Sequence, residues 1–245
     1  MRINLLKWCD EKISYLKKHG ITFKNGVAVL PKESLYKDIP LMVSPYKYRN
    51  DIPEELRSKS LITYFMPDED LWTRMHKIDE DLEELKKFGG ITGFDLSPSI
   101  GMLRPRQKLS LLADSLFNAY CAVKGMKILP NSRLGDLGTL PMIASIPYGS
   151  NFITSRHGCQ NYGFKAYGLY QTKLILERIK PSILFVYGSV SQKEAEQLIE
   201  KYKIKIITFP DRRSRTWNKA KSWCYEEGDK KYEQNILPRF LVWKY

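Results

Sequence analysis

Polar side chains stand directly after several short apolar runs of this chain. Asp95 follows GITGF, Asn131 follows MKILP, and His157 follows NFITSR. A carboxylate and an imidazole can exchange protons with a substrate, and an amide can hold a reacting group by hydrogen bonds. We therefore predict that Asp95, Asn131 and His157 are the catalytic residues if the chain is an enzyme; whether it is one stays open at this point.

Two arginines accompany these residues, Arg133 after Asn131 and Arg156 before His157. Asp, Asn and Ser at strand ends have an ordinary alternative role as turn and cap residues. Arginine and histidine are poor caps, which favours a functional interpretation of the whole set. Because a guanidinium group can hold a phosphate through two parallel hydrogen bonds, we predict Arg133 and Arg156 as nucleic-acid contacts.

The same positions are compatible with other chemistry. Cys159 lies two residues after His157, so a Cys–His nucleophile pair is an alternative, although the fold usually brings such partners together from distant segments. Asp211 also follows an apolar run, and Asp95 and Asp211 together would suit Mg²⁺. Mg²⁺ is thus a candidate cofactor without an assigned ligand set. The repeated YGS, at 148–150 and 187–189, matches no phosphate-binding loop, and no nucleotide cofactor is indicated.

The chain is strongly basic. Lys and Arg number 40 against 27 Asp and Glu, a formal charge of +13 with a pI near 9.4, and such a field attracts polyanions. Residues 68–84 contain eight acidic and two basic residues, whereas residues 212–221 contain five basic residues and no acid. The alternative is that the charge serves solubility. We favour nucleic acid as the partner, and a host protein complex is the second candidate.

The basic stretch near the C-terminus also contains rings. Cations neutralise phosphates along a nucleic-acid strand, while exposed rings stack on unpaired bases. The alternative is that the tryptophans dock the tail on the core while the cations face water. The predicted contacts in this tail are Arg212, Arg213, Arg215, Trp217, Lys219 and Lys221.

Cysteine spacing and hydropathy bear on the compartment. The four cysteines lie far apart without a C-x-x-C pair, which indicates neither a zinc knuckle nor a disulfide framework. Residues 1–20 lack the apolar core of a signal peptide, and we find no run of about 18 apolar residues. We expect a cytoplasmic protein that does not enter a membrane.

The elements that would position these residues follow from periodicity. Residues 4–18 predict an amphipathic helix, and Asn25-Gly26 predicts a hairpin turn after it. Short apolar runs then alternate with helical stretches, typical of βαβ units with a parallel sheet. The expected strands are 61–65, 91–96, 126–130, 151–155, 182–187 and 204–209, with a crossover helix after the second and a capping box at Ser191.

We therefore expect an α/β fold with a largely parallel sheet of about six strands, as an open sheet or an incomplete barrel. Six strands are too few for an eight-stranded barrel unless the N-terminal segment contributes. The expected division is residues 1–60 as N-terminal helix, hairpin and covering arm, 61–211 as the α/β core, and 212–245 as a basic aromatic tail packing on the core. The predicted site residues would lie at the carboxyl ends of the strands.

Four motifs in order, GFDLSPS, GMKILPNSR, YGSNFITSRHGC and ILFVYGS, resemble an uncharacterised family of unknown function found in bacteriophages, plasmids and other mobile elements. The resemblance covers roughly residues 60–212. It implies a mobile-element context and supplies no catalytic residue.

Three functions follow from these observations. The first is a nucleic-acid-binding protein of a mobile element, with a basic surface and a polar site at the strand ends. The second is a hydrolytic or phosphoryl-transfer enzyme acting on nucleic acid or a nucleotide. The third is a protein-binding inhibitor of a host defence complex, a form of anti-defence.

Overall fold

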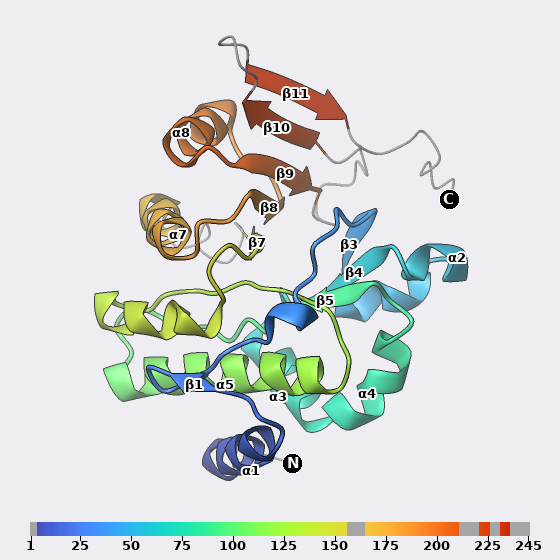
Figure 1. Ribbon diagram of the computed structural model, residues 1–245, viewed down its shortest axis with the longest axis vertical. Coiled ribbons are helices and arrows are strands. Elements are labelled where there is room, and N and C mark those ends of the chain that lie inside the picture. Colours follow the sequence, from blue (N-terminus) through green and yellow to red (C-terminus); the bar gives the residue numbers. More distant parts are fainter. Residues whose placement is uncertain (1–3, 156–164, 211–220, 226–230, 236–245) are drawn as a thin grey trace.

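The structure is a computed structural model that describes residues 4–155, 165–210, 221–225 and 231–235 (Figure 1). Its N-terminal helix α1 (Leu5–Lys18) begins at Asn4, whose side chain accepts a hydrogen bond from the Lys7 N–H at 3.1 Å. A short hairpin of β1 (Phe23–Lys24) and β2 (Val27–Ala28) follows. Its turn residues Asn25 and Gly26 have φ of 52° and 80°, as a tight hairpin requires. The predicted N-terminal helix and hairpin are confirmed.

Two parallel sheets form the centre of the molecule. The first has the order β3 (Met42–Pro45), β4 (Ser60–Thr63), β5 (Gly90–Thr92) and β6 (Ile128–Leu129). The second continues with β7 (Phe152–Ser155), β8 (Ile183–Tyr187) and β9 (Lys205–Phe209). Each parallel strand therefore lies next to its neighbour in sequence. The predicted α/β class with a largely parallel arrangement is confirmed, in two sheets.

Strands also form in two segments of the chain where none was expected. The segment interpreted as a covering arm contains β3, which pairs in parallel with β4, Val43 facing Leu61. Beyond β9, β10 (Lys221–Tyr225) and β11 (Lys231–Asn235) form an antiparallel hairpin that extends the second sheet. A strand of four residues in a stretch rich in Pro, Tyr and Lys has too little periodicity to be recognised.

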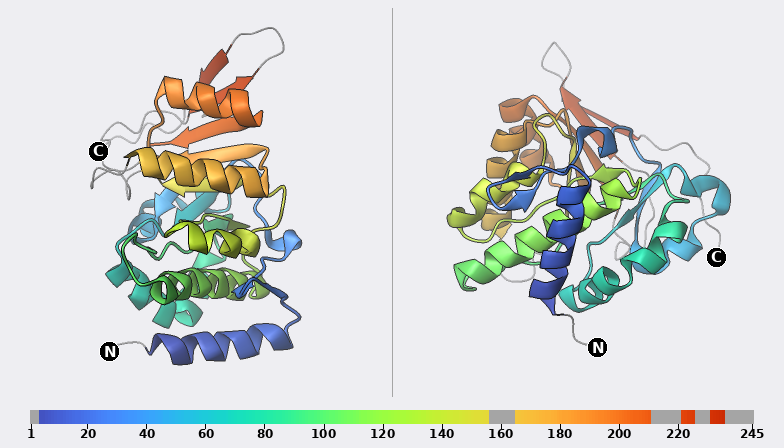
Figure 2. Two further views of the ribbon diagram at one scale, coloured as in Figure 1. Left: turned by 90° about the vertical axis from the view of Figure 1, so that its left-hand side faces the viewer. Right: turned by 60° about the horizontal axis from the view of Figure 1, so that its bottom comes forward.

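Helices connect and cover the strands. They are α2 (Glu54–Arg57), α3 (Asp68–His76), α4 (Ile78–Leu85), α5 (Arg104–Val123), α7 (Lys165–Ile179) and α8 (Gln192–Tyr202), with 3₁₀ segments η1 (Lys32–Ser34), η2 (Tyr46–Asp51) and η3 (Leu137–Ser145). Figure 2 shows α1 and α5 toward one end of the molecule, and α8 with the β10–β11 hairpin toward the other. The expected crossover helix is α5, and the expected capping box at Ser191 begins α8.

The two sheets share an apolar interior. Strand β8 alternates: Phe185 and Tyr187 face an interior cluster, whereas Leu184 and Val186 face the helices α7 and α8. The interior cluster also receives side chains from β3, β4, β6, β7 and β9, so both sheets close on one core. The Ile153 N–H donates to the Pro130 carbonyl at 2.9 Å and links the sheets.

This arrangement is an incomplete barrel. Among the described residues no strand pairing joins β3 to the β9–β11 side, so the barrel stays open there. All seven parallel strands described end at one face, called the mouth below. Within the same described ranges, no helix has both the length and the apolarity needed to span a membrane.

Candidate functional site

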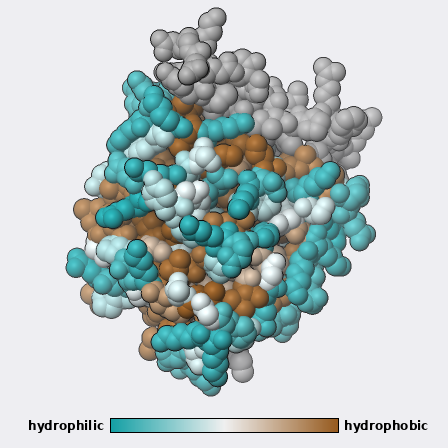
Figure 3. All heavy atoms as spheres, viewed as in Figure 1, coloured by the Kyte–Doolittle hydropathy of each residue, from teal (hydrophilic) through white to brown (hydrophobic). Residues whose placement is uncertain are grey.

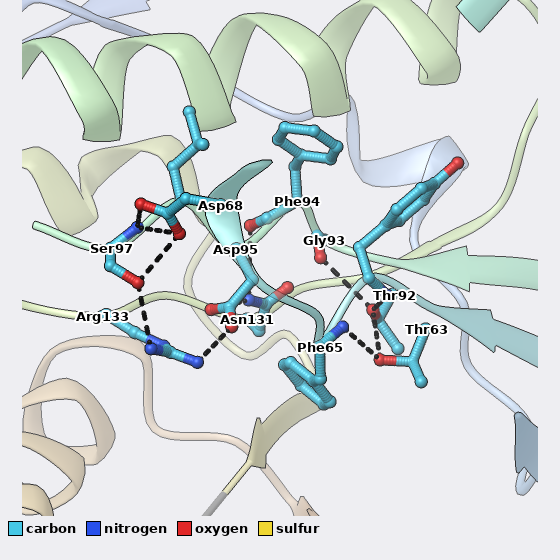
Figure 4. Close-up of polar contacts among 12 residues, drawn as sticks. Thr63, Phe65, Asp68, Thr92, Gly93, Phe94, Asp95, Ser97, Asn131 and Arg133 are labelled. Carbon is cyan, nitrogen blue, oxygen red and sulfur yellow. Dashed lines mark hydrogen bonds and ion pairs between the residues drawn. The ribbon is translucent and has the colours of Figure 1, made fainter. Parts of the chain in front are cut away.

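The backbone that carries Asp95 is held by helix α5. Asn118 accepts a hydrogen bond from the Phe94 N–H at 2.7 Å, and Asp114 accepts one from the Leu96 N–H at 3.0 Å. Asp114 and Asn118 are four residues apart and so lie on one face of the helix. Phe94 and Leu96 join the core beneath α5. Asp95, between them, extends to the other side (Figure 4).

Gly93 allows this segment to lie close to its neighbours. A Cβ atom at Gly93 would stand 2.4 Å from Asn131 Oδ1 and 3.1 Å from Asn118 Nδ2. Real Cβ atoms do not approach other heavy atoms this closely, so a larger residue would displace the amides. Because Gly93 has no side chain, the Asn131 amide has room to lie beside it and to donate its hydrogen bond to Asp95.

Asp95 is the centre of a polar cluster at the mouth. Its carboxylate, in a residue only 2 % exposed, forms an ion pair with Arg133 Nη2 at 2.5 Å and accepts a hydrogen bond from Asn131 Nδ2 at 3.0 Å. Arg133 Nη1 donates to Ser97 Oγ at 3.3 Å, and the Ser97 hydroxyl donates to Asp68 at 3.0 Å (Figure 4). Loops after neighbouring strands β5 and β6 thus supply most of one connected network, the Asp95 cluster.

Burial and charge act in opposite directions on the central carboxyl. Burial raises the pKa of Asp95 to about 6, although the Arg133 guanidinium lowers it and the Asp68 carboxylate raises it further. Burial also raises the pKa of Asp114 well above its ordinary value, and the charges of Asp95 and Asp68 add to this. Asp95 therefore keeps its proton to a higher pH than an exposed aspartate does, and the pKa of Asp114 is shifted in the same direction.

One polar atom of the cluster has no partner. Asn131 donates through Nδ2 to Asp95 and to the Phe94 carbonyl, but its Oδ1 is buried without a hydrogen-bond partner among the described residues. Buried acceptors are normally satisfied by protein, water or ligand. The described residues thus bind the Asn131 amide through Nδ2 and leave Oδ1 as an available acceptor.

A cavity of about 50 Å³ adjoins the cluster. Asp95, Asn131 and Arg133 line its polar end, and the rest is lined mainly by apolar side chains of β7, β8, α7 and α8, with polar residues of β7 and α7 among them. Helix α7 is fastened beside it by Gln171, whose amide accepts from the Leu134 N–H at 3.3 Å and donates to the Leu134 carbonyl. The cavity therefore lies between the two sheets, with its charged groups from the first and most of its apolar side chains from the second.

A wider hollow of about 1010 Å³ opens at the carboxyl ends of β3, β4, β7 and β8. Its wall carries two arginines, both over the ring of Tyr46: the guanidinium carbon of Arg49 lies 4.1 Å and that of Arg74 4.8 Å from the ring centre. Carboxylates of α4 hold both from behind, since Arg49 Nε lies 2.8 Å from Glu84 and Arg74 Nη1 lies 3.0 Å from Asp81. The hollow also contains the exposed Lys47 and the rings of Tyr48, Phe65 and Tyr187.

The structure brings together three of the residues proposed from sequence, Asp95, Asn131 and Arg133. Lys221 is the first residue of β10, opposite Thr208 of β9. The other proposed site residues lie outside the described residues: Arg156, His157, Arg212, Arg213, Arg215, Trp217 and Lys219, together with Cys159 and Asp211. Within the described ranges no group of three or more His, Cys, Asp or Glu side chains could hold a metal ion.

Sequence reasoning missed several residues that build this face. Asp114 and Asn118 stand at helical spacing on the buried side of α5, and polar residues there signal contacts with backbone groups. Gln171 gave a similar but weaker signal within α7. Arg49 and Arg74 had no distinguishing pattern, because their ion pairs with α4 depend entirely on the packing of η2, α3 and α4.

The comparison with protein families identifies the chain. Residues 46–210 match the family described as Domain of unknown function (DUF4417), and the chain belongs to this family. The match includes β4 to β9 and all residues of the Asp95 cluster, and it begins directly after β3. Comparison with curated proteins and with solved structures found no match. The membership confirms the family of unknown function expected from the four motifs.

Proposed function

We propose that this protein binds nucleic acid across the mouth of the incomplete barrel, with the Asp95 cluster as a polar site for a base or a phosphate. The observation that carries the proposal is the hollow beside the cluster, which joins cationic and aromatic side chains on one concave surface. Concave sites at the carboxyl ends of parallel strands are the usual ligand sites of such folds.

The cations of the hollow suit phosphate groups. Arg74 contacts Asp81 and Tyr46 through Nη1 alone, and Arg49 contacts its partners through Nε and Nη1. Their remaining N–H groups are directed by ion pairs from behind, which reduces the entropy lost on binding an anion. Lys47 adds an exposed charge nearby. The net charge of +13 supplies the long-range attraction.

The context proposed with this function is a mobile element, a phage or plasmid, acting in the cytoplasm. This part of the proposal rests on the four motifs GFDLSPS, GMKILPNSR, YGSNFITSRHGC and ILFVYGS. A host protein complex is the alternative partner of the basic surface, and the binding experiment below separates the two.

Binding of labelled single-stranded and duplex oligonucleotides, measured by fluorescence anisotropy over a range of salt concentrations, tests the proposal. We expect affinity to fall steeply with salt, because each neutralised phosphate releases counterions. The triple variant Arg212→Ala, Arg213→Ala, Arg215→Ala should weaken binding regardless of sequence. Lys47→Ala should reduce the slope of log affinity against log salt by about one.

A matched control removes the same number of charges elsewhere. Lys32, Lys37 and Lys59 are exposed and precede strands, at the edge opposite the mouth. Their triple replacement by Ala should change binding little. If the wild-type protein binds no nucleic acid at low salt, or if this control weakens binding as much as the tail variant, the proposal is wrong. Co-purification with a host protein and no affinity for nucleic acid would favour the inhibitor.

A second candidate function is a hydrolytic or phosphoryl-transfer enzyme acting on nucleic acid or a nucleotide. The specific observation in its favour is that Asp95 lines a cavity and has a pKa of about 6, near the range in which a general acid or base works. Asn131 would orient the reacting group, with Oδ1 as acceptor. His157 is the proposed second acid or base.

Asp95→Asn tests this second function. The amide has the same shape and can still accept a hydrogen bond from Asn131, but it cannot exchange a proton. Turnover of nuclease or phosphatase substrates should be lost while the far-ultraviolet circular dichroism spectrum is kept. Unchanged turnover in a folded Asp95→Asn protein would remove Asp95 from the reaction.

A further inference from the structure

Three large apolar side chains are exposed on the rim of the mouth. Leu103 is 81 % exposed, Leu137 55 % and Ile100 47 %. Leu103 precedes α5, Leu137 begins η3, and Ile100 lies in the turn between β5 and α5. Hydrophobic residues do show between hydrophilic ones elsewhere on the surface, as Figure 3 illustrates for one face. We call these three residues the apolar rim; the loops that carry Leu103 and Leu137 are bonded to each other.

A buried glutamine fixes the two loops of the rim to each other. Gln107 Nε2 donates to the Met102 carbonyl at 2.8 Å and to Asp136 at 3.3 Å, and its Oε1 accepts from the Asp136 N–H at 2.8 Å. Its side chain thereby joins the residue before Leu103 to the residue before Leu137. Two exposed leucines are therefore held on one part of the surface.

Glycines let the two loops approach. A Cβ atom at Gly135 would lie 1.9 Å from Gln107 Oε1, and one at Gly138 would lie 2.8 Å from Arg104 Nε. Arg104 Nε also lies 3.6 Å from Asp136. The contact between the loops thus depends on residues without side chains on both sides of Leu137. Exposed apolar residues that are held this firmly indicate an interaction surface.

The charge around the apolar rim is positive. Arg104, Arg106 and Lys108 lie in the first turns of α5 and are all exposed. Among the described residues, Arg104 pairs with Asp136, and no ion pair is formed by Arg106 or Lys108. A partner of this surface therefore combines negative charge with apolar or aromatic faces.

The apolar rim adjoins the Asp95 cluster. The loop that carries Ile100 and Leu103 leaves the cluster at Ser97, and the loop that carries Leu137 leaves it at Arg133. The same loops therefore build the polar site and the rim. A lipid surface pressed on the rim would also cover this polar mouth, which argues against a membrane.

We propose that the apolar rim is a wedge that inserts between base pairs of a nucleic-acid duplex and frees a nucleotide for the Asp95 cluster. This inference rests on the proposed nucleic-acid function. Apolar side chains flanked by arginines unstack base steps in this way. A base can reach the polar side chains of the Asp95 cluster only after it has left its stack. Leu103 is the leading residue of the wedge.

The experiment uses the full chain and duplex DNA that contains 2-aminopurine, whose fluorescence rises when it unstacks. We expect wild-type protein to raise the fluorescence. Leu103→Ser and the double variant Leu103→Ser, Leu137→Ser should lose this rise while keeping the affinity for single strands. Both side chains are exposed, so the variants should keep the wild-type unfolding transition.

Leu6→Ser is the matched control, because Leu6 is a leucine 64 % exposed on α1, away from the mouth. It should leave the fluorescence rise unchanged. If the wild-type protein binds neither single strands nor duplex, the proposed function fails as well. If it binds both, but the fluorescence does not rise or Leu103→Ser keeps the rise, only the wedge is wrong. A change of molecular mass in solution caused by Leu103→Ser would also overturn the wedge, in favour of an interface between copies of this chain.

Discussion

The two halves of the barrel contribute different things to the mouth. The half formed by β3 to β6 supplies polar groups in fixed positions: α5 holds the backbone on either side of Asp95, and Asn131 and Arg133 hold its carboxylate. The half formed by β7 to β9 supplies, among its described residues, mainly apolar side chains to the cavity. Its polar contributions are Thr154, Ser155, Gln171 and Thr172. Of these, Gln171 bonds to the backbone of Leu134 in the other half.

The hydrogen bonds and the ion pair that position the Asp95 cluster lie mostly in the first half. In the first half, Asp95, Arg133 and Ser97 are all bonded to other protein groups, and Asn131 is bonded through Nδ2, so the site is positioned by the protein itself. Among the described residues, the second half is joined to it by the side-chain amides of Gln171 and Asn151, by the backbone hydrogen bond from Ile153 and by the apolar interior. Changes in the first half should therefore disturb the Asp95 cluster directly, whereas changes in the second should act through the junction.

The largest effect is expected at Gly93. Gly93→Ala places a methyl group against Asn131 and Asn118, and the displaced amides leave buried backbone groups without partners. We expect a loss of about 4 kcal/mol in the free energy of unfolding by urea. The double variant Gly93→Ala, Asn131→Ala removes the nearest clashing atom and should recover part of this loss. Equal stability of the two variants would show that the clash with Asn131 is unimportant.

The next effect concerns the pH dependence of stability. The pKa of Asp95 is about 6 in the folded protein and about 3.9 in an unfolded chain, so the folded state binds more protons between these values. Stability should therefore fall as the pH rises from about 4 to 6, by about 3 kcal/mol from this group.

Urea unfolding at a series of pH values measures this fall. Asp95→Asn should make the curve shallower in that window, at the cost of the ion pair with Arg133. The remaining slope should come from Asp114, whose pKa is also raised, and Asp114→Asn measures that part separately. A curve for Asp95→Asn that is as steep as that of the wild type would contradict the raised pKa.

The junction between the halves is tested at Gln171. Gln171→Ala leaves the Leu134 N–H and carbonyl without their amide partners in a buried place, and we expect a loss of about 2 kcal/mol in the free energy of unfolding. Hydrogen exchange of α7 should accelerate more than that of α5 if the second half opens at this junction. Gln192→Ala, an exposed glutamine of α8, is the control and should have little effect.

The smallest effect is expected within the second half itself. Ser191 caps α8 by accepting from the Glu194 N–H, and Glu194 returns a bond to the Ser191 N–H at 3.2 Å. Ser191→Ala should cost about 1 kcal/mol in the free energy of unfolding. Because α8 does not touch Asp95, the pH dependence assigned above to Asp95 should not change. A variant that lost both stability and that pH dependence would refute the separation of the two halves.

Much of the fold could be predicted because periodicity is a local property. The six strands expected from sequence all correspond to strands of the structure, with shorter ends at β5 and β6. Strand β3 could not be recognised, because it is short and its apolar run, residues 39–43, is flanked and interrupted by prolines. The place of β10 and β11 depends on pairing with β9, which no local pattern encodes.

The candidate site was predictable to the same extent. Asp95, Asn131 and Arg133 could be predicted as neighbours because they follow neighbouring strands, and parallel strands end at one face. Asn118 and Asp114, which bind the backbone on either side of Asp95, could not be predicted as part of the site. The role of a polar residue in a helix becomes clear only when its partner is known.

By itself, the sequence determined the α/β class, the N-terminal helix and hairpin, the basic character, and the strand ends at which Asp95, Asn131 and Arg133 stand. Only the tertiary structure decided that two sheets share one interior, that the cluster is buried enough to raise the pKa of Asp95, and that three exposed apolar residues lie beside it. The physical reason is that strand and helix patterns arise from neighbours in the chain, whereas burial and charge pairing arise from residues that the fold brings together.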